Sequence, residues 1–208
     1  MEYKIIVVGI GPGSADYLLP IAKRTIEKAT VLVGSKRALE TFASKNAKTC
    51  VIDKNILGVM QFIHRELIYS EVVVMVSGDP GFYSLLPALK RQFPQNSIKV
   101  IPGISSIQLA SARLAETWQD VKLISMHGRD INIEELRYES GKKLAVLTDH
   151  NNSPAAIAKL LLSLQWPATS SACILSNLSY ESESCITQSL YEICKLEGYQ
   201  QSVMVVGR

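Results

Sequence analysis

Short apolar runs alternate with amphipathic stretches through the first half of the chain. The runs are rich in β-branched residues and predict strands near 4–9, 29–34, 49–53, 71–77 and 97–101. Helical patterns fill the intervals, near 16–28, 35–44, 55–69, 81–92 and 104–115. Strands that alternate with helices in this way are typical of a mainly parallel sheet with helices on its faces.

The second half shows a similar alternation after a polar segment near 116–120. Strands are predicted near 121–126, 143–149, 171–176, 186–190 and 202–207, and helices near 132–138, 153–165 and 191–196. Ser153 followed by Pro154 is typical of a helix start, with Ser153 as the cap. Because no Gly/Ser-rich linker separates the halves, we predict two closely packed α/β domains, 1–115 and 116–208.

Three predicted strands end in turns rich in glycine, proline and serine. The turns read Gly9-Ile10-Gly11-Pro12-Gly13-Ser14, Ser77-Gly78-Asp79-Pro80-Gly81-Phe82-Tyr83-Ser84 and Ile101-Pro102-Gly103-Ile104-Ser105-Ser106. Ligands of open parallel sheets bind beyond the carboxyl ends of the strands. We therefore predict that the turns line one cleft, where main-chain groups approach a small ligand and Phe82 and Tyr83 open the next helix beside it. Plain strand-to-helix turns with capping side chains are the simpler alternative.

The first turn does not fit the common nucleotide-binding patterns. Its glycines follow a G-x-G-x-G spacing rather than G-x-G-x-x-G, and Pro12 lacks an N–H that a phosphate could accept. The second strand ends Leu32-Val33-Gly34-Ser35 without the acidic residue that holds a ribose. A nicotinamide- or ATP-dependent enzyme is therefore disfavoured.

Composition limits the classes of partner and site that the chain could have. Lys and Arg number 22 against 19 Asp and Glu, a net charge of +3 that argues against nucleic acid. The four cysteines form no C-x-x-C pair and only three histidines occur, so no metal site is predicted. No apolar run approaches the roughly 20 residues that span a bilayer. The N-terminus does not resemble a signal peptide, and we predict a cytoplasmic protein with reduced thiols and no membrane partner.

In their order and spacing, the three turns resemble the tetrapyrrole (corrin/porphyrin) methylase family, and the resemblance covers essentially the whole chain. Further segments are similar to the branch that methylates carbon 5 of precorrins in cobalamin biosynthesis: Trp118-Gln119-Asp120, Ser125-Met126-His127-Gly128-Arg129, Leu147-Thr148-Asp149 and Ser153-Pro154. The segment from Asn177 to Glu183 fits that branch's pattern Asn-Leu-Gly-Tyr-Pro-x-Glu, except that Ser179 and Ser182 replace its glycine and proline.

The resemblance implies two α/β domains with S-adenosylmethionine bent into the cleft between them, where the active site lies, and a homodimer. The positions that would contact this cofactor are Pro12, Gly78, Asp79, Pro80, Phe82, Tyr83, Ile104, Ser105, Ser106, Met126, Asn177 and Leu178. Methyl transfer from a sulfonium is an in-line displacement, so catalysis would rest mainly on holding the reactants in line. No strong nucleophile is required of the protein.

A tetrapyrrole acceptor carries many carboxylates, which basic side chains bind well. Lys36 and Arg37, after the turn that ends the second strand, are the first candidates, followed by His127 and Arg129. A solvated surface charge is the alternative for each of them.

Two residues near the first turn complete the candidates. Ser14 stands where some relatives carry an acid and is a further candidate for substrate binding. Asp16 is a candidate for proton handling, with helix capping as the alternative.

The function predicted is methylation of carbon 5 of a cobalt-containing or metal-free precorrin. Methylation of another tetrapyrrole carbon by the same fold is the nearest alternative. A nucleotide-dependent oxidoreductase and a non-catalytic ligand-binding protein are the alternatives from other classes. Because no residues follow Arg208, a carbon-15 methylating and decarboxylating activity is expected in a separate protein.

Overall fold

The computed structural model describes residues 4–126, 132–199 and 202–207. These form two compact units, one up to Ser105 and one from Ser106 onward. The sequence placed the boundary at 115/116, at the other end of a helix, α5 (Ser106–Leu114). The difference arises because α5 contacts a strand of the second sheet, β10 (Ser202–Val206).

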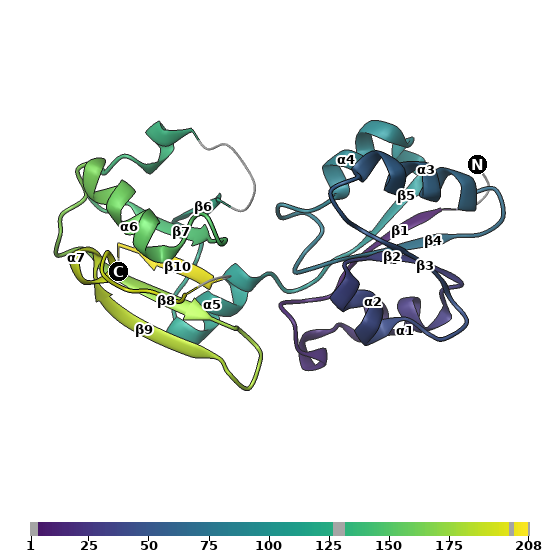
Figure 1. The fold of residues 1–208 in the computed structure, drawn as a ribbon, viewed down its shortest axis with the longest axis horizontal. Helices are drawn as coiled ribbons and strands as arrows, with labels where there is room; N and C mark the ends of the chain where they lie inside the picture. Colours follow the sequence, from purple (N-terminus) through teal and green to yellow (C-terminus); the bar gives the residue numbers. More distant parts are fainter. Residues whose placement is uncertain (1–3, 127–131, 200–201, 208) are drawn as a thin grey trace. The chain divides into compact units, whose positions relative to one another are not determined.

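The first unit is built on a parallel sheet of five strands in the order β3-β2-β4-β1-β5 (Figure 1). Its strands are β1 (Ile5–Gly9), β2 (Val31–Gly34), β3 (Lys48–Val51), β4 (Val72–Val76) and β5 (Ile98–Ile101). Helices α1 (Pro20–Lys28) and α2 (Lys36–Phe42) cover one face, and α3 (Ile56–Glu66) and α4 (Leu86–Gln92) cover the other. The mainly parallel sheet predicted from the alternation is confirmed.

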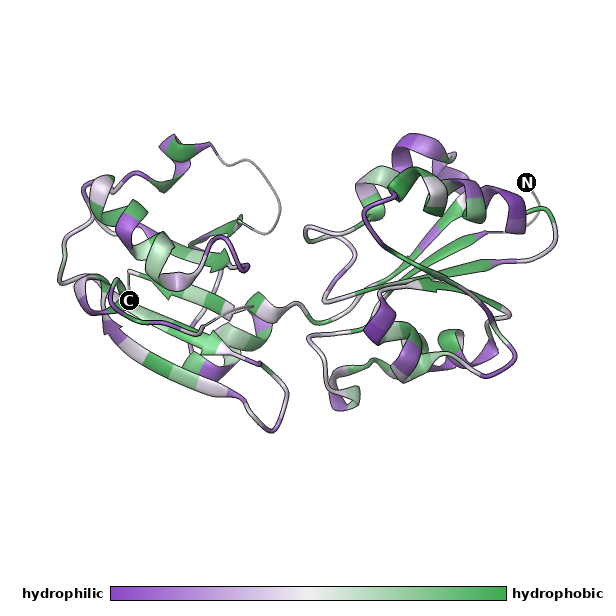
Figure 2. Cartoon of the chain, viewed as in Figure 1, coloured by the Kyte–Doolittle hydropathy of each residue, from purple (hydrophilic) through white to green (hydrophobic). Residues whose placement is uncertain are grey.

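Two apolar layers hold this sheet between its helices. Successive side chains of a strand point to opposite faces, so Ile5 and Val7 pack with α3 and α4 while Ile6 and Val8 pack with α1 and α2. All five residues of β1 and of β4 are buried, which explains why these strands read as unbroken apolar runs. Figure 2 shows the same concentration of apolar residues along the central strands.

The second unit has a mixed sheet in the order β6-β7-β10-β8-β9. Strands β6 (Val121–Ser125) and β7 (Lys143–Leu147) are parallel, whereas the pairs that involve β8 (Ser171–Ser176), β9 (Ser184–Ser189) and β10 are antiparallel. Its main core lies between one face of this sheet and the helices α6 (Pro154–Ser163) and α7 (Leu190–Ile193). Ser153 caps α6, as predicted, because its hydroxyl accepts a hydrogen bond from the Ala156 N–H.

Several predicted helices differ from the structure at their ends, and the one predicted over 132–138 is only a 3₁₀ turn, Ile133–Leu136. The helix predicted over 81–92 begins only at Leu86, and Tyr83 has a φ of +47° that no helix contains. The stretch 16–28 divides into a 3₁₀ turn, Ala15–Tyr17, and α1, which begins at Pro20. The last helix is shorter than predicted. No helix within the described ranges is long and apolar enough to cross a membrane.

Candidate functional site

The carboxyl ends of β1, β4 and β5 meet at one edge of the first sheet, because these three parallel strands are neighbours. The turns that follow β1 and β4 are bonded directly to each other. Gly11 N donates to the Gly78 carbonyl at 3.3 Å, and Gly78 N donates to the Gly11 carbonyl at 2.8 Å. We call the segments 9–14, 77–84 and 101–106 the turn cluster.

Glycine is required in the turn cluster because main chains approach one another too closely for a side chain. A Cβ atom at Gly103 would lie 2.2 Å from the Gly78 carbonyl oxygen, and one at Gly9 would lie 2.6 Å from Gly103 N. Gly78 also has a φ of +67°, a conformation that other residues rarely adopt. The glycines therefore let the three turns pack main chain against main chain.

The carboxylate of Asp79 fastens two of the turns. Its Oδ1 accepts a hydrogen bond from Gly81 N at 2.7 Å, and its Oδ2 accepts one from Gly103 N at 3.0 Å. Hydrogen bonds to an ionised acceptor are stronger than those between neutral groups. Asp79 thus holds the turn cluster in shape, and the direct contact with a cofactor that the resemblance implies stays a prediction.

An aromatic pair stands beside this carboxylate. The rings of Phe82 and Tyr83 are 4.6 Å apart between centroids and nearly perpendicular, at 70°. Tyr83 is 42% exposed, so its ring is available to a ligand rather than buried in the core. The Ser84 hydroxyl donates to the Pro80 carbonyl and accepts from Leu86 N, which starts α4 three residues beyond Tyr83.

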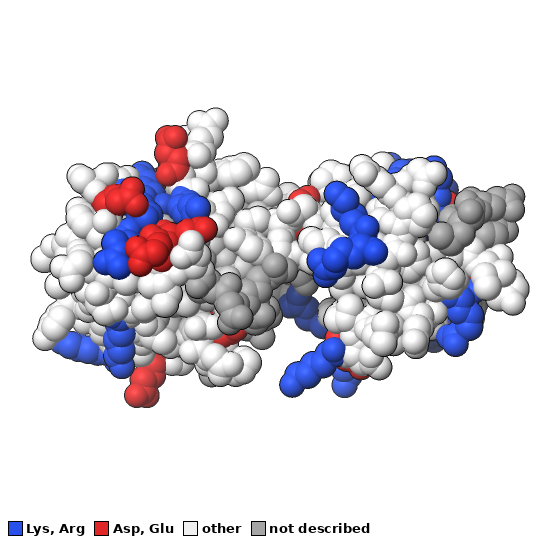
Figure 3. Space-filling view, turned by 90° about the horizontal axis from the view of Figure 1, so that it is seen from above, with Lys and Arg blue, Asp and Glu red and all other residues white. Residues whose placement is uncertain are grey.

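The predicted substrate residues of the first unit lie at or near the same sheet edge. Lys36 and Arg37 are the first two residues of α2, directly after β2, which is a neighbour of β4. Lys36 is exposed, and its Nζ lies 3.9 Å from a carboxylate oxygen of Glu40. Ser14 accepts a hydrogen bond from Asp16 N and so caps the first 3₁₀ turn. In the view of Figure 3 the first unit shows chiefly basic side chains, whereas the second shows both signs close together.

Met126 follows β6 at one edge of the second sheet. It is buried, its N–H donates to the Leu147 carbonyl at 3.0 Å, and its carbonyl accepts from Asn152 Nδ2 at 2.8 Å. Asn152 is held in turn by Asp149, whose Oδ1 accepts from Asn152 N at 2.7 Å. Asp149 and Asn152 therefore fix the main chain of a predicted cofactor residue.

The turn after β8 carries Asn177 and Leu178. Asn177 and Ser179 have φ values of +51° and +75°, and Leu178 between them is buried. Ser179 thus adopts a left-handed conformation that suits the glycine of the pattern it departs from. The turn keeps this shape although its side chain makes the conformation less favourable.

A charged pair supports that turn. Glu183 Oε2 accepts a hydrogen bond from Ser179 N at 2.7 Å, and the Glu183 carboxylate also accepts two hydrogen bonds from the Arg113 guanidinium. Arg113 lies in the last turn of α5. The hydrogen bond from Arg113 holds the pKa of Glu183 below its ordinary value, and the bond from Ser179 acts in the same direction. Glu183 therefore stays ionised and anchors the turn to α5.

Each set of predicted cofactor residues lies together within its own unit. The first-unit residues belong to the turn cluster, whereas Met126 and Asn177 follow two strands that end at one edge of the second sheet and Ser106 begins α5. His127 and Arg129 lie outside the described residues.

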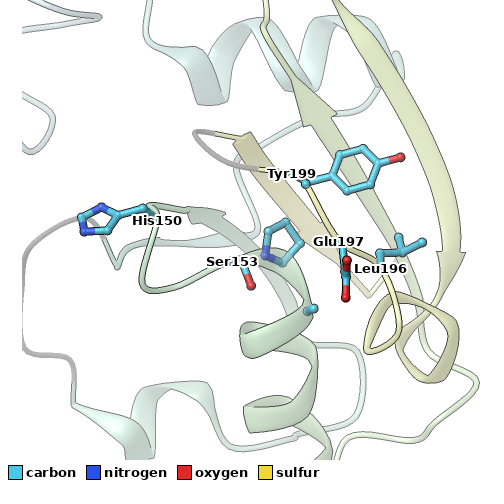
Figure 4. Close-up of a pocket in the computed structure, with 8 residues that line it drawn as sticks. His150, Ser153, Leu196, Glu197 and Tyr199 are labelled. Atoms are coloured by element: carbon cyan, nitrogen blue, oxygen red, sulfur yellow. The ribbon is translucent and has the colours of Figure 1, made fainter.

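A separate pocket of about 260 Å³ in the second unit was not predicted. It is lined by residues that include His150, Ser153 and Tyr199, which come from segments about fifty positions apart in the chain. In Figure 4 the side chains of His150 and Tyr199 point in opposite directions, so they form no catalytic pair. Across the part of the chain that the structure describes, no three His, Cys, Asp or Glu side chains gather as a metal site would require.

Comparison with known proteins adds the family. The family model for tetrapyrrole (corrin/porphyrin) methylases matches residues 4–194. The chain belongs to this family. It is 37% identical over 194 residues to a probable cobalt-precorrin-7 C(5)-methyltransferase of Methanocaldococcus jannaschii, covering 91% of this chain and 90% of that relative.

Two further proteins match this chain over different shares of their own length. A precorrin-6Y C(5,15)-methyltransferase [decarboxylating] of Sinorhizobium is 34% identical over 76% of this chain, which matches 38% of that longer protein. The fold resembles the crystal structure of a uroporphyrin-III C-methyltransferase from Thermus thermophilus complexed with S-adenosylhomocysteine, with a TM-score of 0.79 and 19% identity over 98% of this chain and 92% of that one. The two-domain α/β fold predicted from the resemblance is confirmed.

Proposed function

We propose that this protein is an S-adenosylmethionine-dependent methyltransferase that methylates carbon 5 of a cobalt-precorrin in cobalamin biosynthesis. The observation that carries the proposal is the turn cluster, in which Asp79 ties two main-chain turns together beside an exposed aromatic ring. The long match to a relative named for the same reaction supports the choice of acceptor.

The residues of the turn cluster suit this cofactor. Its backbone is packed so closely that any Cβ at Gly103 would clash, and the one carboxylate at its centre is already satisfied by two N–H groups. A wall of closely packed main chain beside an exposed aromatic residue suits an adenosine group and a sulfonium. S-adenosylmethionine supplies a methyl group that is already activated for displacement by its sulfonium.

In the proposed site, the residues of the chain bind the methyl donor and the acceptor and orient them for transfer. The main chain of the turn cluster fixes the methyl donor, with Pro12, Phe82 and Tyr83 as its walls. Lys36 and Arg37 bind acceptor carboxylates at the edge of the first sheet. Holding two reactants in line can lower the activation barrier by up to about 7 to 11 kcal/mol. The site therefore needs no protein nucleophile.

Ligand binding provides the first test. Calorimetric titration with S-adenosylhomocysteine, NADH and ATP, each alone, is expected to show binding of the thioether and none of NADH. Tight binding of NADH without the thioether would overturn the methyltransferase proposal. An assay with ¹³C-methyl-labelled donor and a cobalt-precorrin acceptor then locates the new methyl group by NMR. Label on a ring carbon other than carbon 5 would contradict the position and leave methyl transfer standing.

The acceptor site is tested by a double variant, Lys36→Ala with Arg37→Ala. The KM for the acceptor is expected to rise while the affinity for S-adenosylhomocysteine stays unchanged, since the acceptor carboxylates lose their partners and no residue of the turn cluster is altered. Lys23→Ala with Arg24→Ala is the matched control, because it removes another exposed Lys–Arg pair, from α1. Equal KM values in the two double variants would remove Lys36 and Arg37 from the site.

The proposal includes a homodimer and a cytoplasmic location, and it leaves the carbon-15 step to another protein. Analytical sedimentation of the native protein measures its oligomeric state. A monomer at the concentration of the activity assay would contradict it.

A further inference from the structure

Two cysteines face each other across the β8–β9 hairpin. The Sγ atoms of Cys173 and Cys185 lie 3.1 Å apart and share a thiol hydrogen bond. In the strand register Cys173 is opposite Thr187 and Cys185 is opposite Leu175, so the two cysteines are diagonal neighbours on adjacent strands. Both point to the face of the sheet away from its main core, because Ile174 and Ile186 between them pack on that core.

The two thiols differ in their access to solvent. Cys173 is completely buried, whereas Cys185 is exposed. β9 is the last strand in the sheet order and, among the described residues, pairs with β8 alone. An edge strand can shift relative to its neighbour more easily than a central one, so the approach of the sulfurs from 3.1 Å to bonding distance requires little of the sheet.

We propose that Cys185 is a site of thiol modification by small disulfides and that Cys173 is the resolving thiol, so that oxidation joins them in an intrachain disulfide. The Cys185 thiolate attacks one sulfur of the small disulfide, whose S–S bond breaks and releases one thiolate, which takes up the proton lost by Cys185. Cys173 then attacks Sγ of Cys185, and the second small thiol leaves with the proton of Cys173. Two protein thiols are oxidised, and one small disulfide is reduced to two thiols.

The geometry makes this pair selective among the four cysteines. Cys50 lies in β3 of the first unit and Cys194 follows α7, and neither has a sulfur partner among the interactions of the described residues. Burial raises the pKa of the Cys50 thiol, and the negative charge of Asp53 adds to the effect. A raised pKa leaves less thiolate at neutral pH, so Cys50 is expected to react more slowly.

The modification is independent of methyl transfer. The bond would close the loop from residue 173 to 185, which contains the turn at Asn177 and its anchor Glu183. No step of the proposed transfer uses either thiol. The chemistry can therefore be tested on the protein alone, without cofactor or acceptor.

The experiment treats the native full chain with oxidised glutathione and follows its mass. We expect the loss of two hydrogens without a lasting glutathione adduct. Trypsin cannot separate the cysteines, because no Lys or Arg lies between 173 and 185. A glutamate-specific protease can, because it cuts after Glu181 and Glu183, and a cut after Glu192 separates Cys194. The disulfide is then identified as a bond between two peptides.

Variants make the result decisive. Cys173→Ser is expected to keep a stable glutathione adduct on Cys185, because the resolving thiol is gone. Cys50→Ser with Cys194→Ser is the matched control and should form the disulfide like the unaltered chain. Oxidised protein should also unfold at a higher temperature than reduced protein, since the bond limits the unfolded hairpin.

Three outcomes would overturn the proposal. One is a lasting glutathione adduct on Cys185 of the unaltered chain, which would show that Cys173 does not resolve it. Another is a disulfide that uses Cys50 or Cys194 instead. The third is a native protein that stays unmodified while the same chain reacts after unfolding in urea, because Cys185 would then be inaccessible in the fold.

Discussion

The turn cluster of the first unit and the turn after β8 in the second hold main chain at the ends of strands, but by different means. The first is closed by main-chain contacts between glycines, with one carboxylate that bridges two turns. The second depends on the ion pair between Glu183 and Arg113. Close packing tolerates no added atom, whereas an ion pair tolerates small changes of shape but is weakened by salt. The two turns should therefore fail under different perturbations.

The largest effect is expected from Gly103→Ala. The new Cβ would lie 2.2 Å from the Gly78 carbonyl oxygen, and overpacking of this kind should lower the free energy of unfolding by about 3 kcal/mol. Binding of S-adenosylhomocysteine should be lost as well. Urea denaturation and calorimetry measure the two effects.

Gly34→Ala is the control for this variant. Its Cβ would meet the flexible end of the Met75 side chain at 3.1 Å, so the loss should stay under about 1 kcal/mol. Comparable losses in the two variants would show that the turn cluster is not closely packed.

The next effect is expected from Asp79→Asn. An amide presents one oxygen and one NH₂ group where two backbone N–H groups now donate, so the variant should lose about 2 kcal/mol of stability and bind S-adenosylhomocysteine more weakly. Asp53→Asn is the control, because Asp53 accepts from a single N–H, that of Asn55, and its amide oxygen can replace the carboxylate. If both substitutions cost the same, Asp79 does not bridge the turns.

A smaller effect, and one that depends on pH, is expected from Glu183→Gln. The pKa of Glu183 is lowered by the hydrogen bond from Arg113, so its stabilisation is present above the ordinary pKa of 4.5 and is lost as the pH falls. The variant should lose about 1 kcal/mol at pH 7 and show a flatter decline of stability in acid. Denaturation curves from neutral pH downward measure both, and salt should reduce the difference.

Glu134→Gln serves as its comparison. Glu134 also has a lowered pKa, caused by the hydrogen bond from Arg137, but both side chains of this pair are exposed. Removal of this pair should leave the decline of stability at low pH almost unchanged. If the stability of Glu183→Gln declined with falling pH as that of the unaltered chain does, the ion pair would not support the turn.

The smallest effect is expected from Ser179→Gly, and it is a gain. Glycine adopts the φ of +75° without the strain that serine bears there, so stability should rise by about 0.5 kcal/mol after the entropy of the unfolded chain is counted. Ser182→Gly is the control, because Ser182 does not have a positive φ; it should be destabilising. A loss at both positions would contradict the strain at Ser179.

Much of the fold was predictable because the strands are strongly β-branched and buried. The runs at β1 and β4 could be recognised as central strands from four and five consecutive apolar residues, respectively. The start of α4 could not, since the Ser84 hydroxyl bonds the main chain of Pro80 and Leu86 and favours turns where the pattern favours a helix.

The candidate site was predictable only in part. The meeting of the three turns follows from the strand order, which the alternation of strands and helices already favours. The support of Met126 by Asn152 and the pairing of Arg113 with Glu183 leave no local pattern, because the partners are 26 and 70 positions apart. Such pairs become visible only when the chain is folded.

The proposed recognition of the methyl donor by main chain has a practical consequence for engineering. Peptide groups are the same whatever side chains they carry, so the donor end is constrained at the glycines that pack closely and at the bridging Asp79. Libraries that seek new acceptors can vary the exposed positions at the start of α2, provided that Asp79 and the glycines at 9, 78 and 103 are left untouched. The positions that an engineer must keep are thereby distinct from those that can be varied.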